Sequence, residues 1–420
     1  MSAFDNLATR VSEHRLSALL AKLATFGARA DGGVDRQALT PPDVEARAFL
    51  ADHAAALGCT AALDPAGNLF MRRAGMADVA PVVTGSHVDT QPAGGKLDGA
   101  YGICAGLEVI AALNDAHIQT RHPIDVVAWS NEEGCRFSPG SLGAQAFVEP
   151  QRFDALAAAE DARGVRYADD MVTMRRALAH LPQHGLGTPM RAFVEAHIEQ
   201  GPVLEEADVP IGIVVGVQGV RWFRVVARGR AAHAGTTPLA LRRDALRAVS
   251  ALLAELYGAA ERVADLRLTV GRIDVTPDSI NTIPGEATIT VDMRHAEAAV
   301  LDVAEKLLRD FCSDERYGCT LAVEPLMHLS TTRFDDGVCT SLRRAANHVG
   351  LPAMDIMSGA FHDSVHLATH CPTGMLFVPS RDGLSHHPDE YTDPSLLADG
   401  ARVLAVALAS YAEVTGTSKP

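Results

Sequence analysis

PVVTGSHVDT (residues 81–90) and IDVVAWSNEEG (residues 124–134) give the clearest structural signal in the chain. Each opens with a short, mostly apolar run, at residues 81–84 and 124–129, and closes with imidazole or carboxylate side chains. Short continuous apolar runs are typical of strands buried inside a parallel sheet. Ligands of such sheets bind at the carboxyl ends of the strands, so we predict a functional site that includes His87, Glu132 and Glu133.

The segments around these two strands alternate between helical and strand-like patterns. A helical period covers residues 99–113, and further strand-like runs cover residues 192–198 and 375–378. An Ala-rich stretch at residues 395–412 predicts a closing helix. This alternation predicts an α/β catalytic domain, in which helices cover a mixed, largely parallel sheet.

Residues 211–328 follow a different pattern. Strand-like runs and helical periods come in the order β-α-β-β-α-β, which is that of a ferredoxin-like α+β fold. The runs lie at 220–227, 266–273, 287–293 and 320–323, and the helical periods at 241–257 and 297–311. We therefore predict a discontinuous catalytic domain (residues 1–210 and 329–420) with an inserted dimerisation or lid domain (residues 211–328).

The composition disfavours several classes of protein. The chain has 420 residues, of which 47% are hydrophobic, and this length favours two domains. A net charge of −15 argues against nucleic-acid or anionic membrane partners. No window is long and apolar enough for a membrane span or a signal peptide, so we expect a cytoplasmic protein that acts on a small molecule.

Carboxylate and imidazole side chains beside strand ends and glycines form a candidate metal centre. They are His87, Asp89, Asp98, Glu132, Glu133, His197, His386 and His387. Any one of them alone is better explained as a surface charge or a core histidine, but the whole set favours a site. Neutral imidazoles with carboxylates suit zinc, manganese or cobalt, and ligands from separate loops suit two ions.

The positions of three carboxylates suggest different tasks. Asp98 lies among glycines that allow close approach of the backbone, so it is our candidate for a bridge between two ions. Asp89 follows His87 by two residues and is our candidate for orienting its imidazole. Adjacent glutamates point in different directions, so one of the pair can bind metal while the other accepts a proton.

Seven motifs, taken together and in order, resemble the zinc-dependent hydantoinase/carbamoylase amidohydrolases. That family includes N-carbamoyl-L-amino acid hydrolases, β-ureidopropionases and allantoate amidohydrolases, and it is related to dinuclear aminoacylases and carboxypeptidases. The motifs are GSHVDTQPAGGKLDGAYGI, SNEEGCRF, EAHIEQGPVLE, HAGTTPLALRRDA, DSINTIPG, VDMRH and SGAFHDS. No single motif is specific, but the ordered set is.

The resemblance implies two divalent ions, zinc first, with manganese or cobalt as alternatives. One ion would be held by His87, Asp98 and His197, and Asp98 would bridge to a second ion held by Glu133 and His386. The family places a ligand directly after serine, which favours His386 over its neighbour His387. Glu132 would be the general base.

The resemblance also implies contacts to a carboxylate substrate. The residues concerned are Gln200, His233, Asn281, Arg294, Gly359 and Phe361. His233 would polarise the substrate carbonyl, and in such homodimers this residue tends to reach the active site of the partner. Arg294 has the planar donor pattern that suits a carboxylate. Phe361 stands where the family commonly has a small residue, which leaves the identity of the substrate open.

The activity that the resemblance implies is hydrolysis of the carbamoyl (ureido) C–N bond of N-carbamoyl-L-amino acids or related ureido acids. Ammonia, carbon dioxide and an amino acid would be released. The alternatives are an allantoate amidohydrolase, a β-ureidopropionase and, further away, an aminoacylase or dipeptidase. The HIEQG pattern at His197 and Gln200 favours the carbamoylase branch. A catalytically silent metal-binding protein is disfavoured because all the candidate ligands and the base are present.

Overall fold

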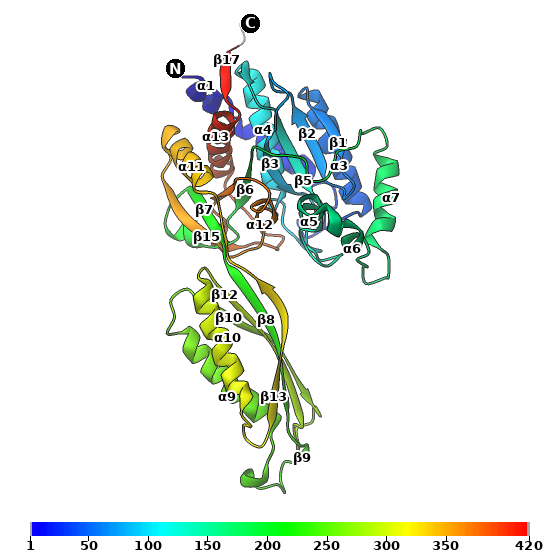
Figure 1. Cartoon of the computed structure of the whole chain (residues 1–420), viewed down its shortest axis with the longest axis vertical. Helices are drawn as coiled ribbons and strands as arrows, with labels where there is room; N and C mark the ends of the chain where they lie inside the picture. The colour runs from blue at the N-terminus through cyan, green and yellow to red at the C-terminus, as the bar shows by residue number, and fades with distance from the viewer. Residues whose placement is uncertain (1, 418–420) are drawn as a thin grey trace. The chain divides into compact units, whose positions relative to one another are not determined.

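The computed structural model describes residues 2–417, which divide into two compact units. The second unit is Gly216–Thr332, and the first contains the rest of the described chain (Figure 1). Each unit is described by itself below. Among residues 2–417, no helix combines the length and the apolar character needed to cross a membrane.

The first unit is built on one mixed sheet. In order across the sheet, its strands are β1 (Thr60–Leu63), β2 (Leu69–Arg73), β5 (Ile124–Trp129), β3 (Val82–His87), β6 (Ala192–Ile198), β16 (Thr373–Val378), β7 (Ile211–Val217) and β14 (Thr332–Arg333), and β15 (Ala353–Ser358) pairs with β7. The central strands β5, β3, β6 and β16 are parallel, whereas β2 and β7 join them antiparallel. The predicted mixed α/β sheet is therefore confirmed.

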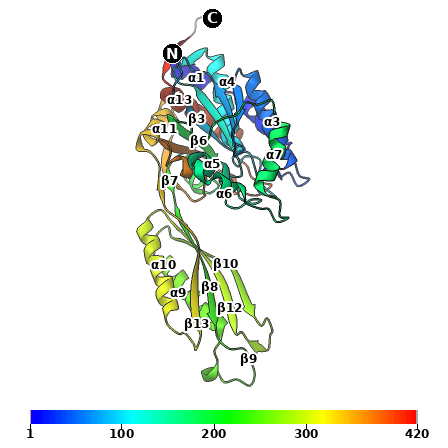
Figure 2. The same ribbon diagram turned by 45° about the vertical axis from the view of Figure 1, so that its right-hand side comes forward.

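Helices cover both faces of this sheet (Figures 1 and 2). They are α1 (Ala3–Arg10), α2 (Glu13–Leu23), α3 (Pro41–Ala56), α4 (Ala100–Asp115), α5 (Leu142–Val148), α6 (Phe153–Ala157), α7 (Tyr167–Ala177), α8 (Val203–Glu206), α11 (Asp336–His348), α12 (Ser364–Leu367) and α13 (Pro394–Tyr411). Helices α4 and α13 pack on each other and on the central strands. Helix α4 is buried at every residue from Ala100 to Leu113, as expected of a helix that is apolar all round. Its N-terminus is thereby fixed beside the ends of β3 and β6.

The opposite face is covered by α5 and α12. Phe70, Val83, Val127, Trp129 and Phe193 of the sheet share one apolar cluster with Ala144, Phe147 and Leu367 of these helices. A small separate sheet of the same unit pairs β4 (Ile118–Thr120) with β17 (Val414–Thr417).

The predicted central strands are close to the observed ones, with one informative difference. Residues 124–129 and 192–198 form strands with the predicted bounds, but β3 continues to His87 instead of ending at residue 84. Glycine is depleted in strands, and neither serine nor histidine is among the residues that favour them. Ser86 is accommodated inside the sheet because its hydroxyl donates to Glu195 on β6 over 2.6 Å.

The second unit is an antiparallel sheet with two helices on one face (Figure 2). Its elements are β8 (Gly219–Arg228), β9 (Ala232–His233), α9 (Ala245–Ala260), β10 (Arg267–Thr276), β11 (Thr282–Ile283), β12 (Glu286–His295), α10 (Ala298–Ser313) and β13 (Thr320–Leu329). The strand order is β10-β12-β8-β13, and all pairs are antiparallel, so the predicted ferredoxin-like arrangement is confirmed. The core lies between the sheet and helices α9 and α10.

Two boundaries differ from the predictions. Helix α9 begins at Ala245 instead of residue 241, because Asp244 caps it by accepting the N–H of Arg247 and a 3₁₀ turn follows Pro238. Strand β7 pairs with β16 of the first unit, although the prediction assigned residues from 211 onward to the inserted domain. The apolar run Ile211–Val217 suits either sheet, so its sequence does not distinguish them.

Candidate metal centre

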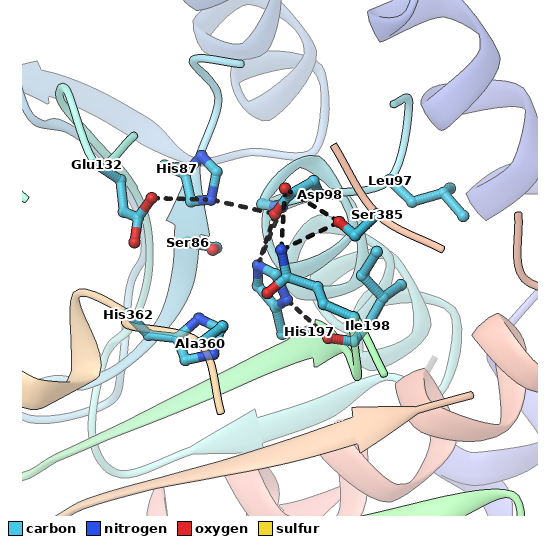
Figure 3. Close-up of polar contacts among 12 residues, drawn as sticks. Ser86, His87, Leu97, Asp98, Glu132, His197, Ile198, Ala360, His362 and Ser385 are labelled. Carbon is cyan, nitrogen blue, oxygen red and sulfur yellow. Dashed lines mark hydrogen bonds and ion pairs between the residues drawn. The ribbon is translucent and has the colours of Figure 1, made fainter. Parts of the chain in front are cut away.

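The candidate metal centre lies at the carboxyl ends of three adjacent parallel strands (Figure 3). His87 is the last residue of β3, His197 lies near the end of β6, and the turn after β5 carries Glu132 and Glu133. The loop before α4 adds Asp98. Parallel strands end at the same edge of the sheet, which is why residues far apart in the chain meet here.

Asp98 is buried at the middle of this arrangement. Its Oδ1 lies 3.2 Å from Nε2 of His197 and 3.6 Å from Nε2 of His87, and its Oδ2 lies 3.1 Å from Nε2 of His386. Burial alone would raise the pKa of Asp98, but the three imidazoles that face its oxygens hold that pKa well below its usual value. The two oxygens of the Asp98 carboxylate therefore face different imidazoles of the centre.

Two trios of side chains offer ligand atoms that lie within 4.8 Å of one another. The first trio is His87, Asp98 and His197, and the second is Asp98, Glu133 and His386. They share Asp98, as an arrangement for two bridged ions requires. The structure thus brings the five predicted ligands together, while their binding of ions stays a prediction.

The histidines of the first trio are held so that Nε2 faces the site. Nδ1 of His87 lies 2.9 Å from the carbonyl of Asp89, and Nδ1 of His197 lies 2.9 Å from the carbonyl of Ile198. A carbonyl accepts hydrogen bonds, so Nδ1 carries the hydrogen in the neutral ring and Nε2 keeps a lone pair. The backbone N–H of Gly99 donates to Nε2 of His197 over 3.1 Å, which agrees with that tautomer.

Gly99 is required by the shape of the centre. Its φ is 63°, and a Cβ at this position would lie 2.5 Å from the ring of His87. Any side chain here would displace the imidazole. This observation supports the prediction that glycines beside Asp98 allow close approach.

Asp89 acts on a different group from the predicted one. The imidazole of His87 is oriented by the main-chain carbonyl of Asp89, not by its carboxylate. The carboxylate is buried and accepts the backbone N–H groups of Glu132 and Glu133, both over 3.3 Å. Asp89 therefore fixes the turn that carries the two glutamates.

The two glutamates point to opposite sides of the centre. Oε2 of Glu132 lies 3.6 Å from Nε2 of His87, whereas Oε2 of Glu133 lies 3.6 Å from Nε2 of His386. Gln91 donates to Glu133 from its backbone (3.1 Å) and from its amide (2.8 Å). The geometry therefore allows the predicted roles, in which one glutamate binds metal while the other accepts a proton.

Three carboxylates, those of Asp98, Glu132 and Glu133, meet at this place with side chains that are at most 9% exposed. Burial, together with the nearby Asp98, raises the pKa of Glu133 to about 7, and burial raises that of Glu132 well above its usual value. A divalent cation relieves such a concentration of buried carboxylate, because it compensates the negative charge. The donor set therefore fits a metal centre.

The structure separates His386 from His387. His386 faces Asp98 and Glu133, and its hydrogen bond with Asp98 raises its pKa to about 9. His387 turns away, so that its Nδ1 accepts the backbone N–H of Asp389 over 3.1 Å. The geometry agrees with the choice of His386.

The third possible trio, Glu195, His197 and His362, is less suited to an ion. Both oxygens of Glu195 already accept hydroxyl hydrogen bonds, from Ser86 (2.6 Å) and Ser364 (2.5 Å). His362 lies beside His197, with ring centroids 4.7 Å apart. The loop that contains Gly359 and Phe361 is therefore adjacent to the centre.

Phe361 packs against the short helix that follows its loop. Its ring lies edge-to-face against His366 of α12, with centroids 5.5 Å apart. This contact orients the aromatic ring that distinguishes the SGAFHDS motif from the family pattern. Its contact with substrate stays a prediction.

Gln200 and Glu390 have contacts that the sequence did not reveal. The amide of Gln200 donates to Oδ2 of Asp98 and to Oγ of Ser385, both over 3.1 Å, although we predicted a substrate contact for it. Glu390 is buried and accepts the backbone N–H groups of Leu97 and Asp98. A glutamate four residues after His386 carries no local signal for this role.

The other predicted substrate residues lie in the second unit. His233 on β9 is paired with Thr282 on β11, the residue that follows Asn281. The N–H of Ala234 donates to the carbonyl of Asn281. Nδ1 of His233 accepts the N–H groups of Gly235 (3.0 Å) and Thr236 (3.2 Å), so the neutral ring carries its hydrogen on Nε2 and can donate it. Arg294 on β12 is paired with Asp292, with 2.8 Å between Nη2 and Oδ2.

The sequence profile of the peptidase family M20/M25/M40 matches residues 83–410, which include the whole candidate centre. The chain belongs to this family. M20 enzymes are metal-dependent hydrolases, so the predicted hydrolase class and the need for metal are confirmed at that level.

Relatives and solved structures agree with the motif-based resemblance. The chain is 37% identical over 400 residues to an N-carbamoyl-L-amino acid amidohydrolase of Geobacillus stearothermophilus, covering 94% of this chain and 97% of that one. It is 34% identical over 395 residues to an allantoate amidohydrolase of Escherichia coli, covering 92% and 95%. A crystal structure of a hydantoinase/carbamoylase family amidase from Burkholderia multivorans superimposes with a TM-score of 0.90 at 41% identity, covering 96% and 98%. The resemblance to hydantoinase/carbamoylase amidohydrolases is therefore confirmed for this M20 chain.

Proposed function

We propose that this chain hydrolyses the carbamoyl (ureido) C–N bond of N-carbamoyl-L-amino acids or related ureido acids. The observation that carries the proposal is the pair of ligand trios that share Asp98, with Glu132 beside them. Relatives with the corresponding name are 37%, 35% and 34% identical over nearly the whole chain. This combination supports an amidohydrolase with its metal ligands and base intact.

The proposed cofactor is two divalent ions, zinc first, with manganese or cobalt as alternatives. Three imidazoles and two carboxylates are a donor set that all three metals accept. His87 and His197 would hold one ion, Glu133 and His386 the other, and Asp98 both. Bound ions of this kind polarise a carbonyl and lower the pKa of water.

Glu132 would act as the general base. Its buried carboxylate has a raised pKa, so it can take a proton and keep it until the leaving group needs it. Oε2 would accept a proton from the attacking water, whose oxygen joins the carbonyl carbon. The C–N bond to the terminal amino group then breaks, and Glu132 returns the proton to that nitrogen, which leaves as ammonia. The remaining carbamate loses carbon dioxide and yields the amino acid.

Six further residues would bind the rest of the substrate. Arg294 would hold the substrate carboxylate, and Nε2–H of His233, with Asn281, would stabilise the negative charge on the carbonyl oxygen. Gln200, Gly359 and Phe361 would border the substrate from the first unit. These roles rest on the family resemblance and on the local geometry of each residue.

The proposal includes a homodimer formed through the inserted domain and a cytoplasmic location. In this dimer His233 would serve the active site of the partner. Sedimentation at micromolar concentration tests the dimer, and a monomer would contradict it.

An allantoate amidohydrolase is the second candidate. Relatives with that name from Escherichia coli and Bacillus subtilis are 34% and 33% identical over more than nine-tenths of this chain. A β-ureidopropionase and an aminoacylase or dipeptidase are further alternatives, because the M20 family is broad.

The test is a release assay on metal-stripped protein reloaded separately with zinc, manganese or cobalt. N-carbamoyl-L-amino acids, β-ureidopropionate, allantoate and N-acetyl-L-amino acids are the substrates, and ammonia and free amine are both measured. Ammonia released fastest from N-carbamoyl-L-amino acids supports the proposal. Faster release from allantoate or β-ureidopropionate, or amine released only from N-acetyl substrates, would replace it with the corresponding alternative.

A further inference from the structure

Glu390 is a buried carboxylate that none of the proposed chemical steps uses. It lies in the loop between His386 and α13, with 5% of the residue exposed. Its Oε1 accepts the backbone N–H groups of Leu97 (2.9 Å) and Asp98 (3.1 Å). Its Oε2 accepts the hydroxyl of Ser385 over 2.9 Å. Both oxygens are therefore engaged with the segments that carry candidate ligands.

These contacts join two loops that are far apart in the chain. One oxygen fixes the main chain at Asp98, and the other fixes Ser385, which directly precedes His386. Gln200 closes the network, because its amide donates to Asp98 and to Ser385. Figure 3 shows Leu97, Asp98 and Ser385 gathered beside the candidate centre.

The glycine-rich loop before Asp98 is shaped around this carboxylate. A Cβ at Gly95 would lie 2.1 Å from Oε1 of Glu390. The close approach lets one carboxylate reach two consecutive N–H groups of the loop, at Leu97 and Asp98. A shorter side chain at position 390 would leave these donors without their partner.

The two trios differ in how much they depend on this support. His87 and His197 are each held by a main-chain carbonyl at Nδ1. In contrast, His386 is half exposed, with 49% of its side chain accessible, and its partners are the carboxylates of Asp98 and Glu133. Loss of Glu390 should therefore disturb the second trio more than the first.

We propose that Glu390 is a positioning residue, which holds Asp98 and the His386 loop together and thereby sets the affinity for the second ion. The inference rests on the proposed dinuclear centre. Outer groups that orient ligands typically contribute about 10–100-fold to metal affinity. Glu390→Ala should weaken the second zinc-binding step by that order and leave the first step within a few-fold.

Glu390→Gln separates position from charge. The amide oxygen still accepts from Leu97 and Asp98, and the amide N–H can donate to Oγ of Ser385, so positioning predicts affinity closer to wild type than to Glu390→Ala. Ser385→Ala removes only the second arm and should weaken the second step in part. Asp389→Asn is the matched control, because it removes one negative charge at the residue just before Glu390, where 78% of the side chain is exposed.

The experiment is a zinc titration of the metal-stripped full chain against a chromophoric chelator, with circular dichroism as the check on folding. A second step that weakens in Glu390→Ala and Ser385→Ala but not in Asp389→Asn supports the inference. Equal affinities in wild type and Glu390→Ala, or equal weakening of both steps, would overturn it. A Glu390→Gln as weak as Glu390→Ala would also overturn it, since charge would then be the cause. Wild type that binds no zinc, manganese or cobalt would instead contradict the proposed function.

If Glu390→Ala fails to fold, the zinc affinities of Glu390→Gln and Ser385→Ala test the inference instead. Glu390→Gln and Ser385→Ala each keep most of the packing, and wild-type affinity in Ser385→Ala would then count against the inference.

Discussion

Nε2 of His386 lies 3.1 Å from Oδ2 of Asp98, although the histidine comes from the loop before α13 and the aspartate from the loop before α4. The other oxygen of Asp98 faces His197 and His87. One buried carboxylate thus connects imidazoles from three separate segments. The proposed two-ion centre depends on this connection.

His386→Ala should remove one ion and leave the other, because His386 belongs to the second trio alone. His387→Ala is the matched control, since its ring turns away to Asp389. Metal content after dialysis against a weak chelator measures the effect. Two ions retained in the first variant, or one ion lost from the control, would reverse the assignment of these neighbours.

Glu132→Gln should lose activity on the order of 10²–10⁴-fold and keep both ions, because a general base acts on a proton and not on the metal. Its Oε2 lies 3.6 Å from His87, on the side away from Glu133. Turnover and metal content are measured on the same sample. Glu133→Gln gives the contrast, since it should lose metal. A Glu132→Gln protein that loses an ion as readily would show that Glu132 is a ligand.

Arg294→Lys should raise KM for carboxylate substrates with kcat nearly unchanged. The guanidinium already adopts a paired arrangement with the Asp292 carboxylate, which is the geometry that a substrate carboxylate would use. Charged hydrogen bonds contribute about 1.5–3 kcal/mol, so KM should rise on the order of 10–100-fold. A substrate analogue whose carboxylate is replaced by an amide is the control. Equal losses on both compounds would remove Arg294 from carboxylate binding.

His366 should make the fold sensitive to mild acid. Burial, with a smaller effect of Arg152, lowers its pKa from 6.5 to about 4, and its Nε2 is buried without a hydrogen-bond partner among residues 2–417. Between pH 6.5 and about 4, His366 is therefore protonated in the unfolded chain but neutral in the folded chain. Stability is lost as the pH falls from 6.5 towards 4, by about 2–3 kcal/mol at pH 4.5.

The free energy of unfolding of wild type and His366→Gln, measured with chelator present at pH 7.5 and 4.5, tests this effect. The wild type should lose about 2–3 kcal/mol more than the variant between the two pH values. The same loss in both proteins would show that His366 does not cause the sensitivity.

The sequence was informative where a local pattern dictates structure. The apolar runs of β5 and β6 predicted their bounds, and the alternation in residues 211–328 predicted a ferredoxin-like order. The polar end of β3 escaped prediction because Ser86 is stabilised by Glu195 from another strand. Such a contact leaves no trace in the local pattern.

The candidate site shows the same limit. Individual ligand candidates could be named from the motifs, but the contacts that hold them depend on groups from distant segments. Asp89 was assigned to the ring of His87, yet its carboxylate holds the backbone of Glu132 and Glu133. Glu390 was not predicted as a site residue, because it accepts hydrogen bonds from main-chain N–H groups. Every residue except proline has such a group, so these partners cannot be recognised from the sequence.

Anomalous diffraction at the zinc absorption edge, from crystals of the zinc-loaded chain, distinguishes a two-ion centre bridged by Asp98 from other arrangements. We expect two peaks that both lie at bonding distance, about 2.0–2.2 Å, from the carboxylate of Asp98. One peak should also contact His87 and His197, and the other Glu133 and His386. A single peak, or a pair in which Asp98 contacts only one ion, would rule out the bridged centre.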